Sequence, residues 1–270
     1  MTELYCRATM NYALSLTDID PIEVQIFNGR QQPDLNWSEQ GFELIQHESA
    51  LNDWSDETRI ASQHYAEMEA LARRLSGCDH ALIAGHILRN PSKAALHDDF
   101  APIQYVHSDF TESYGDLIRD RYLDAEPETQ QALQRAGIDL TDVVNARRIL
   151  ILQFWRNIGP REVDLPLAFC DARSVPRDDL VAYHVPEYGG RASPFDTFGV
   201  TRPEPAESHR WYVFPAMGAD EVVAFRTYDS DLVAQGRPFW TPHSAFQDPS
   251  VKRGEPRHSI ELRATCLWSD

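Results

Sequence analysis

The chain contains no cluster of basic residues. Lys and Arg total 25 against 42 Asp and Glu, which gives a formal net charge of −17. Because a protein neutralises phosphates with a cationic face, this composition argues against a nucleic-acid partner. Long apolar runs are also missing, since segments 149–152 and 221–225 are far shorter than the ~20 residues of a membrane-spanning helix. We therefore expect a soluble protein that acts on neither nucleic acids nor membranes.

Cysteine is scarce, and the N-terminus has no basic segment followed by an apolar one. The four cysteines lie far apart and form no C-x-x-C pair: Cys6, Cys78, Cys170 and Cys266. A framework of disulfides or a zinc site requires closer spacings, and an export signal requires the missing leader. We expect reduced thiols in a cytoplasmic protein.

The best-known catalytic signatures are missing as well. The sequence contains no G-x-S-x-G elbow, no G-x-x-x-x-G-K-[ST] phosphate loop, no G-x-G-x-x-G and no H-E-x-x-H. The common serine hydrolases, nucleotide-binding folds and zincins are therefore excluded.

The pattern of short apolar runs predicts a mainly β fold with α decoration. We expect a single domain over 1–270, with an N-terminal β-arm and helix in 1–80 and a jelly-roll core in 100–270, the double-stranded β-helix of cupin-like proteins. A charged helical segment, 111–137, is either a lid over a pocket or a solvated connection. The predicted strands are 22–27, 42–45, 81–84, 103–107, 149–155, 165–169, 211–214, 222–227 and 259–268.

One long helix is predicted over 53–75. Ser55 is a suitable N-cap and Gly77 a suitable stop. The apolar stripe of this helix has the spacing of a single buried face, at Ile60, His64, Met68, Leu71 and Leu75.

The first chemical signal is His107-Ser108-Asp109 at the end of a predicted strand. Alternate residues of a strand point to the same side, so His107 and Asp109 face one way. Joined by one distant histidine, these two residues form the 2-His-1-carboxylate triad, which leaves three adjacent positions of a non-haem Fe(II) open. We predict His243 as the third ligand.

A basic and a hydroxyl residue follow His243 at the start of the last predicted strand. Arg257 and Ser259 are two residues apart and point to the same side, where a guanidinium fork and a hydroxyl suit the distal carboxylate of 2-oxoglutarate. Arg263 lies on the same face. It is an alternative anchor, or a member of a structural network with Glu261.

Other histidines compete for the metal. His209 also precedes a predicted strand, but no R-x-S follows it at the required distance, so we favour His243. We interpret His184 as an ordinary loop or core histidine and the segment 97–99 as a solvated turn.

Four aromatic and basic residues are candidates for the substrate pocket, because such groups often line ligand sites. The alternative is that the two tryptophans only fill the core. These candidates are Trp155, Arg156, Trp211 and Tyr212.

The motifs together resemble the AsaB/CmcJ-type hydroxylases and desaturases, non-haem Fe(II)/2-oxoglutarate oxygenases of secondary metabolism. The resemblance covers most of the chain. It implies a double-stranded β-helix, His107, Asp109 and His243 as iron ligands, and Arg257 and Ser259 on the co-substrate. The segments that carry it are 10–12, 41–44, 64–67, 106–111, 166–174, 209–215, 228–230, 242–249 and 257–263.

The chain departs from this pattern where we expect Asn-x-Trp-Arg-Pro, because it has Gln153-Phe154-Trp155-Arg156-Asn157. The predicted function is Fe(II)/2-oxoglutarate-dependent oxidation of a natural-product-type small molecule by O₂, with release of succinate and CO₂. Two alternatives are a zinc-dependent hydrolase using the same triad and a non-catalytic jelly-roll binding module. The sequence does not predict the oligomeric state.

Overall fold

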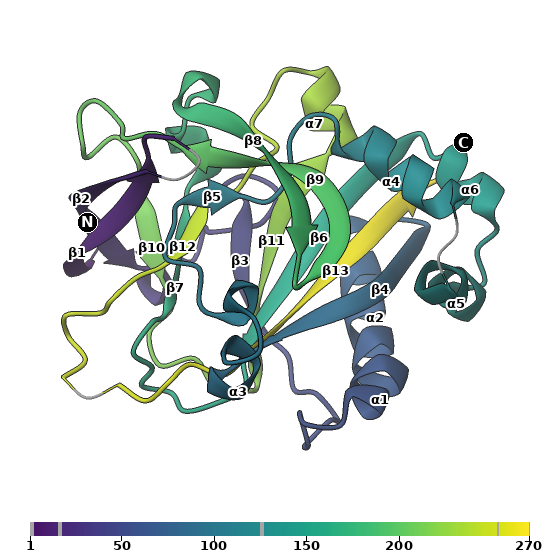
Figure 1. Ribbon diagram of the computed structural model, residues 1–270, viewed down its shortest axis with the longest axis horizontal. Coiled ribbons are helices and arrows are strands. Elements are labelled where there is room, and N and C mark those ends of the chain that lie inside the picture. The colour runs from purple at the N-terminus through teal and green to yellow at the C-terminus, as the bar shows by residue number, and fades with distance from the viewer. Residues whose placement is uncertain (1–2, 16–17, 125–126, 253, 270) are drawn as a thin grey trace.

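A computed structural model describes residues 3–15, 18–124, 127–252 and 254–269 (Figure 1). Two sheets form the body of the molecule, and the predicted jelly-roll fold is confirmed. In the order in which neighbouring strands pair, the eight-stranded sheet consists of β1 (Leu4–Ala13), β2 (Ile19–Asn28), β10 (Trp211–Val213), β7 (Leu167–Cys170), β12 (His243–Ala245), β5 (His107–Ser108), β9 (Arg191–Val200) and β8 (Leu180–Tyr188). The five-stranded sheet consists of β3 (Phe42–Gln46), β11 (Glu221–Asp229), β6 (Arg148–Asn157), β13 (Ser259–Trp268) and β4 (His80–Arg89).

The helices are short and lie around the sheets. Among the described residues, no helix is both long and apolar enough to cross a bilayer. The α-helices are α1 (Glu57–Arg59), α2 (Tyr65–Ser76), α3 (Pro91–Ala94), α4 (Tyr114–Leu123), α5 (Pro127–Ala136), α6 (Leu140–Val144) and α7 (Ser230–Ala234).

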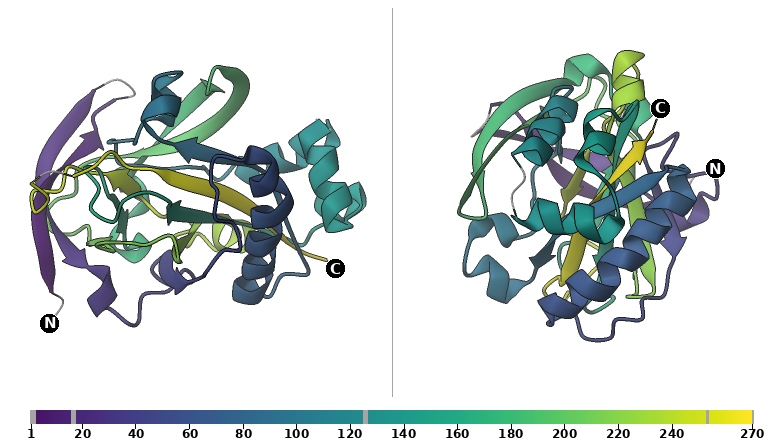
Figure 2. Two further views of the ribbon diagram at one scale, coloured as in Figure 1. Left: turned by 90° about the horizontal axis from the view of Figure 1, so that it is seen from below. Right: turned by 90° about the vertical axis from the view of Figure 1, so that its right-hand side faces the viewer.

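Strands β6 and β13 show how the sequence separates the core from the site. Their even-numbered residues, such as Leu152 and Leu262, pack against Met68 and Leu71 of α2 on the outer face of the sheet. Figure 2 shows α2 beside this sheet. The odd-numbered residues of β13 face the opposite way, so strand alternation directs several polar side chains into the space between the sheets.

The helix predicted over 53–75 is interrupted. It consists of α1, a π-helical turn over Ile60–His64, and α2. Asp56 caps its start by accepting a hydrogen bond from the Arg59 amide at 3.0 Å, so the prediction of Ser55 as the cap is wrong. Gly77 ends it with φ +69°, as predicted.

The long hairpin of β8 and β9 was not predicted from the sequence. Gly189 and Gly190 form its turn with φ values of +60° and +73°. Two consecutive residues with positive φ are the signature of the tight turn that joins antiparallel strands. This hairpin covers one side of the candidate site.

Two short strands at the centre of the eight-stranded sheet bring together segments that are far apart in the sequence. β5 pairs with β12 so that His107 lies opposite His243. Segment 111–137 contains α4 and α5, so its described part is mainly helical as predicted, and residues 125–126 lie outside the described residues.

Candidate active site

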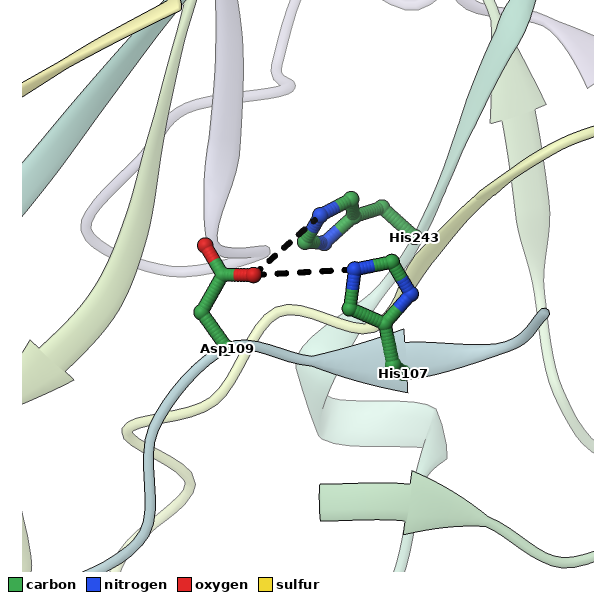
Figure 3. A group of neighbouring side chains, drawn as sticks. All are labelled: His107, Asp109 and His243. Carbon is green, nitrogen blue, oxygen red and sulfur yellow. Dashed lines mark ion pairs between the residues drawn. The ribbon is translucent and has the colours of Figure 1, made fainter. Parts of the chain in front are cut away.

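His107, Asp109 and His243 form a compact group of potential metal ligands (Figure 3). One donor atom from each residue lies within 4.8 Å of the other two. Asp109 Oδ1 lies 3.6 Å from His107 Nε2 and 3.8 Å from His243 Nε2. The structure thus brings together the three residues that the sequence predicted, although His243 follows the other two by about half of the chain length.

Backbone carbonyls fix how the two imidazoles are oriented. His107 Nδ1 lies 2.7 Å from the Tyr105 carbonyl oxygen, and His243 Nδ1 lies 3.0 Å from that of Thr241. A carbonyl only accepts, so each Nδ1 carries the proton and each Nε2 keeps a lone pair. Second contacts of this kind orient the histidine ligands of metals.

The surroundings of His107 and Asp109 favour the protonation states that metal binding requires. Desolvation and then the neighbouring His243 lower the pKa of His107 to about 4. Burial alone would raise the pKa of Asp109, but Arg263 and the two imidazoles outweigh it and the net shift is downward. The Nε2 atoms of His107 and His243 and the Asp109 carboxylate therefore direct lone pairs at a common centre, which suits a divalent cation such as Fe(II).

Arg263 lies against the other oxygen of Asp109. Its NH2 atom is 3.5 Å from Asp109 Oδ2 and 3.3 Å from Glu261 Oε1, and its Nε donates to Gln153 Oε1 at 3.0 Å. Gln153 and Arg263 are direct cross-strand partners on β6 and β13. Burial lowers the pKa of Arg263, and the two carboxylates more than reverse this, so the guanidinium stays charged.

The triad lines a cavity of about 240 Å³ between the two sheets. Strands β8 and β9 supply one wall and the start of β13 another. Besides the triad, the lining consists of Arg89, Asp99, Ile103, Tyr105, Trp155, Leu167, Tyr183, Val185, Tyr188, Phe195, Thr197, Arg257, Glu261 and Arg263. We call this space the metal cavity.

Arg89, Arg257 and Arg263 all line this cavity, but only one of them lacks a carboxylate partner among the described residues. Arg89 lies 3.5 Å from Glu261 and bonds the Tyr188 hydroxyl at 2.8 Å. Arg257 donates from NH1 to the Leu165 carbonyl at 2.9 Å, and its Nε is buried without a hydrogen-bond partner. Burial and the nearby Arg89 lower the pKa of Arg257 to about 9, as expected for a buried cation that lacks a counter-ion.

Ser259 and Trp155 extend the polar surface around Arg257. The Ser259 hydroxyl and the Trp155 Nε1–H are buried and have no hydrogen-bond partner in the described part of the chain. Trp155 lines the metal cavity and its ring lies 5.5 Å from the Arg257 guanidinium, whereas Ser259 is not among the lining residues. Unbonded buried donors are costly, so this corner suits a bound anion with several acceptor oxygens.

Three of the predicted substrate residues lie outside the metal cavity. Arg156 is on the opposite face of β6 from Trp155, where it donates to the carbonyls of His47 and Ala219. Trp211 is in the core and donates to the Tyr12 hydroxyl at 2.8 Å. Tyr212 packs among aromatic side chains in another part of the core. This placement does not support a role for Arg156, Trp211 or Tyr212 in substrate binding.

The competing histidines are used elsewhere. His209 Nε2 pairs with Asp179 at 3.0 Å, and His184 Nδ1 pairs with Asp196 at 2.9 Å. Neither belongs to the metal-ligand group. Segment 97–99 forms a turn in which His97 Nδ1 lies 3.3 Å from Asp99 Oδ2.

Several residues of the cavity were not predicted, namely Arg89, Tyr105, Tyr183 and Tyr188, and Glu261 was noted only for its strand face. The Gly-Gly turn was the available signal for the strand that carries Tyr183 and Tyr188. No local pattern marks Arg89, because its place depends on the pairing of β4 with β13.

The fold and the site define a jelly-roll protein with an open His-Asp-His group and an unpaired arginine beside it. A family model described as "YDMC: Oxidoreductase/YMDC permease-like domain" matches residues 7–267. Hydroxylase/desaturase efuI of Hormonema carpetanum is 32% identical to the chain, over 88% of the chain and 80% of that protein. Hydroxylase/desaturase CTB9 of Cercospora beticola is 27% identical, over 92% of the chain and 76% of that protein.

A solved structure of the iron and alpha-ketoglutarate-dependent endoperoxidase NvfI has the same fold, with a TM-score of 0.77 over the full length of both chains at 21% identity. The chain belongs to this family of oxidoreductases, which includes enzymes named hydroxylase/desaturase. The resemblance predicted from the sequence is therefore confirmed.

Proposed function

We propose that this protein is an Fe(II)- and 2-oxoglutarate-dependent oxygenase of a small molecule, with His107, Asp109 and His243 holding the metal. The converging donor atoms carry this proposal. Relatives with matching names support it, among them the Fe(II)/2-oxoglutarate-dependent dioxygenase nvfI of Aspergillus novofumigatus, which is 27% identical over 98% of the chain. We also propose a cytoplasmic location, which the four free cysteines support.

With 2-oxoglutarate and O₂, bound iron supplies the oxidation of a substrate C–H bond, with release of succinate and CO₂. Other residues of the chain orient the three ligand side chains. The Tyr105 and Thr241 carbonyls hold the two imidazoles, and Arg263 holds the outer oxygen of Asp109. An ion held by these three residues would border the metal cavity, where the co-substrate and the substrate could reach it.

Arg257 is proposed to bind the distal carboxylate of 2-oxoglutarate, with Ser259 assisting. Arg263 is engaged by Asp109, Glu261 and Gln153, whereas the Nε of Arg257 and the Ser259 hydroxyl have no partners. A carboxylate would satisfy both groups and neutralise a buried charge.

Zinc also accepts two histidines and one carboxylate, so the donor set alone does not distinguish an oxygenase from a hydrolase. The unpaired Arg257 supports the oxygenase, because a keto acid carries a far carboxylate that needs an anchor. Neither a hydrolase nor a non-catalytic module is named among the relatives reported above.

The test is a titration of the anaerobic Fe(II) protein with 2-oxoglutarate, followed by the visible charge-transfer absorption of a chelated keto acid. Arg257→Met should weaken 2-oxoglutarate binding by roughly tenfold or more, because it removes a charged hydrogen-bonding partner. Arg161→Met is the matched control, since the Arg161 side chain is 66% exposed and Arg161 is not part of the metal cavity.

The proposal fails if the wild-type protein gives no such absorption. If Arg257→Met binds 2-oxoglutarate as tightly as the wild type and Arg263→Met does not, Arg263 is the anchor instead.

A further inference from the structure

A second cavity of about 330 Å³ adjoins the metal cavity. It lies between α4 and β4, and we call it the α4 cavity. The two cavities share Tyr188, Glu261 and Arg263 as lining residues, so the cavities adjoin at these side chains. The remaining lining residues of the α4 cavity are Ala84, Gly85, His86, Ile87, Tyr114, Ile118, Arg121, Tyr122, Thr129 and Thr265.

The metal cavity alone is too small for its proposed contents together with a natural-product substrate. Its volume is about 240 Å³. Pockets that enclose drug-sized ligands measure roughly 300–1,000 Å³. An ion and a five-carbon keto acid would occupy much of the metal cavity, so the body of a larger substrate must extend into an adjoining space.

The walls of the α4 cavity suit a ring system. Ile87 of β4 and Ile118, Tyr114 and Tyr122 of α4 supply apolar and aromatic surface. Tyr114 is itself held in place, because its ring stacks on that of Phe110 with centroids 3.4 Å apart. Fixed aromatic walls favour flat or polycyclic apolar ligands, which bury their faces against such rings.

Arg121 gives this cavity a positive charge that forms no ion pair with a carboxylate of the described residues. Its NH2 atom donates to the Ser193 hydroxyl at 3.2 Å and to the Pro194 carbonyl at 3.0 Å, which fixes the guanidinium against β9. No Asp or Glu of the described residues lies within ion-pair distance of it.

The other charges of the α4 cavity do not cancel Arg121. Glu261 already pairs with Arg263 at 3.3 Å and with Arg89 at 3.5 Å. Burial lowers the pKa of His86, which keeps that imidazole neutral, and its Nδ1 is 2.7 Å from the Tyr65 hydroxyl. The α4 cavity therefore offers one available cation beside an apolar chamber.

We infer that the α4 cavity binds the body of the substrate, and that this substrate is a ring-containing small molecule with a carboxylate that pairs with Arg121. This inference rests on the proposed function, because the carbon to be oxidised must reach the metal cavity past Tyr188, Glu261 and Arg263, which line both cavities. It assigns α4, within segment 111–137, as a wall of the substrate site and not merely a connection.

The experiment measures binding of two probes to the anaerobic Fe(II) protein saturated with 2-oxoglutarate, by calorimetry. 2-Naphthoate carries a ring system and a carboxylate, and 2-naphthamide is its neutral analogue. Wild type should bind naphthoate more tightly than naphthamide. Arg121→Gln should weaken naphthoate binding by roughly tenfold or more and leave naphthamide binding unchanged.

Two further variants complete the design. Arg119→Gln is the matched control, because Arg119 is on the same helix, contacts Asp116 at 3.7 Å and does not line the α4 cavity. It should change neither affinity. Ile118→Trp should fill the chamber and weaken both probes, while the titration with 2-oxoglutarate stays as in wild type.

The inference is overturned if wild type binds neither probe, if Arg121→Gln keeps full affinity for naphthoate, or if excess 2-oxoglutarate displaces naphthoate. Failure of the proposed function has a different signature. The keto-acid absorption would then be missing in wild type, a result that does not depend on either naphthalene probe.

Discussion

At the scale of single residues, Gln153 helps to hold the Arg263 side chain beside the metal ligands. Strand alternation places Arg263 on the same face as Ser259 and Glu261, and the structure agrees. It does not reveal which arginine is free to bind a ligand. That depends on Gln153, which lies 110 positions before Arg263 in the chain yet accepts its Nε–H.

Gln153 is also where the chain departs from the expected family pattern, which has Asn. An asparagine is shorter by one methylene, so it would not reach Arg263 from the same backbone position. We infer that Gln153 orients the Arg263 guanidinium toward Asp109. The substitution thus concerns the support of the metal site and not the substrate pocket directly.

Gln153→Leu should lower the free energy of unfolding of the metal-free protein by about 1 kcal/mol, because it removes the partly buried hydrogen bond to Arg263 Nε. Chemical denaturation measures this. Gln235→Leu removes an exposed contact to Arg237 and should change stability by less than about 0.5 kcal/mol. Equal stability of Gln153→Leu and wild type would show that this hydrogen bond does not hold Arg263.

At the scale of elements, long apolar periodicity was predictable and special turns were not. The stripe that includes Ile60, Met68 and Leu71 identified the helical segment, and these side chains are fully buried. The π-helical turn at Ile60–His64 was missed because one extra residue per turn leaves little trace in an apolar pattern. Strand β5 spans only His107–Ser108. A strand this short leaves no clear pattern in the sequence, because its position is set by pairing with β9 and β12.

The π-helical turn places His64 in a buried polar contact that makes stability depend on pH. His64 Nδ1 lies 2.8 Å from Glu67, and burial is the main cause that lowers the pKa of His64 to about 4. The folded state therefore favours the neutral imidazole, and the unfolded chain takes up a proton below the usual value near 6.5. The contribution of His64 is complete above about pH 6.5 and is lost as the pH falls toward 4.

His64→Gln should make the free energy of unfolding less dependent on pH between about 4 and 6.5, since it removes this proton uptake. Denaturant titrations at several pH values test it. His184→Gln is the control, because the His184 side chain is 64% exposed and should leave the slope as in wild type. An unchanged slope in His64→Gln would mean that other buried histidines, such as His209, dominate the acid response.

At the scale of the whole molecule, the negative net charge does not reflect the positive charge that lines the site. The chain carries −17, yet the walls of the two adjoining cavities contain Arg89, Arg121, Arg257 and Arg263. Global charge slows the approach of anions, but a fixed guanidinium at short range determines whether they bind. The sequence does not show that these four arginines lie close together, because they come from β4, α4 and the C-terminal segment.

A metal ion bound by the triad would also connect β5 with β12 in the eight-stranded sheet, because His107 and His243 lie opposite each other on these strands. A ligand that binds only the folded state stabilises it by about 2.7 kcal/mol at a hundredfold excess over its dissociation constant. We therefore expect anaerobic Fe(II) to raise the melting temperature by roughly 5 °C and a chelator to reverse the rise. His243→Ala should abolish this shift and His209→Ala should retain it, because His209 pairs with Asp179 away from the metal group. A shift that persists in His243→Ala, or disappears in His209→Ala, would show that the iron binds elsewhere.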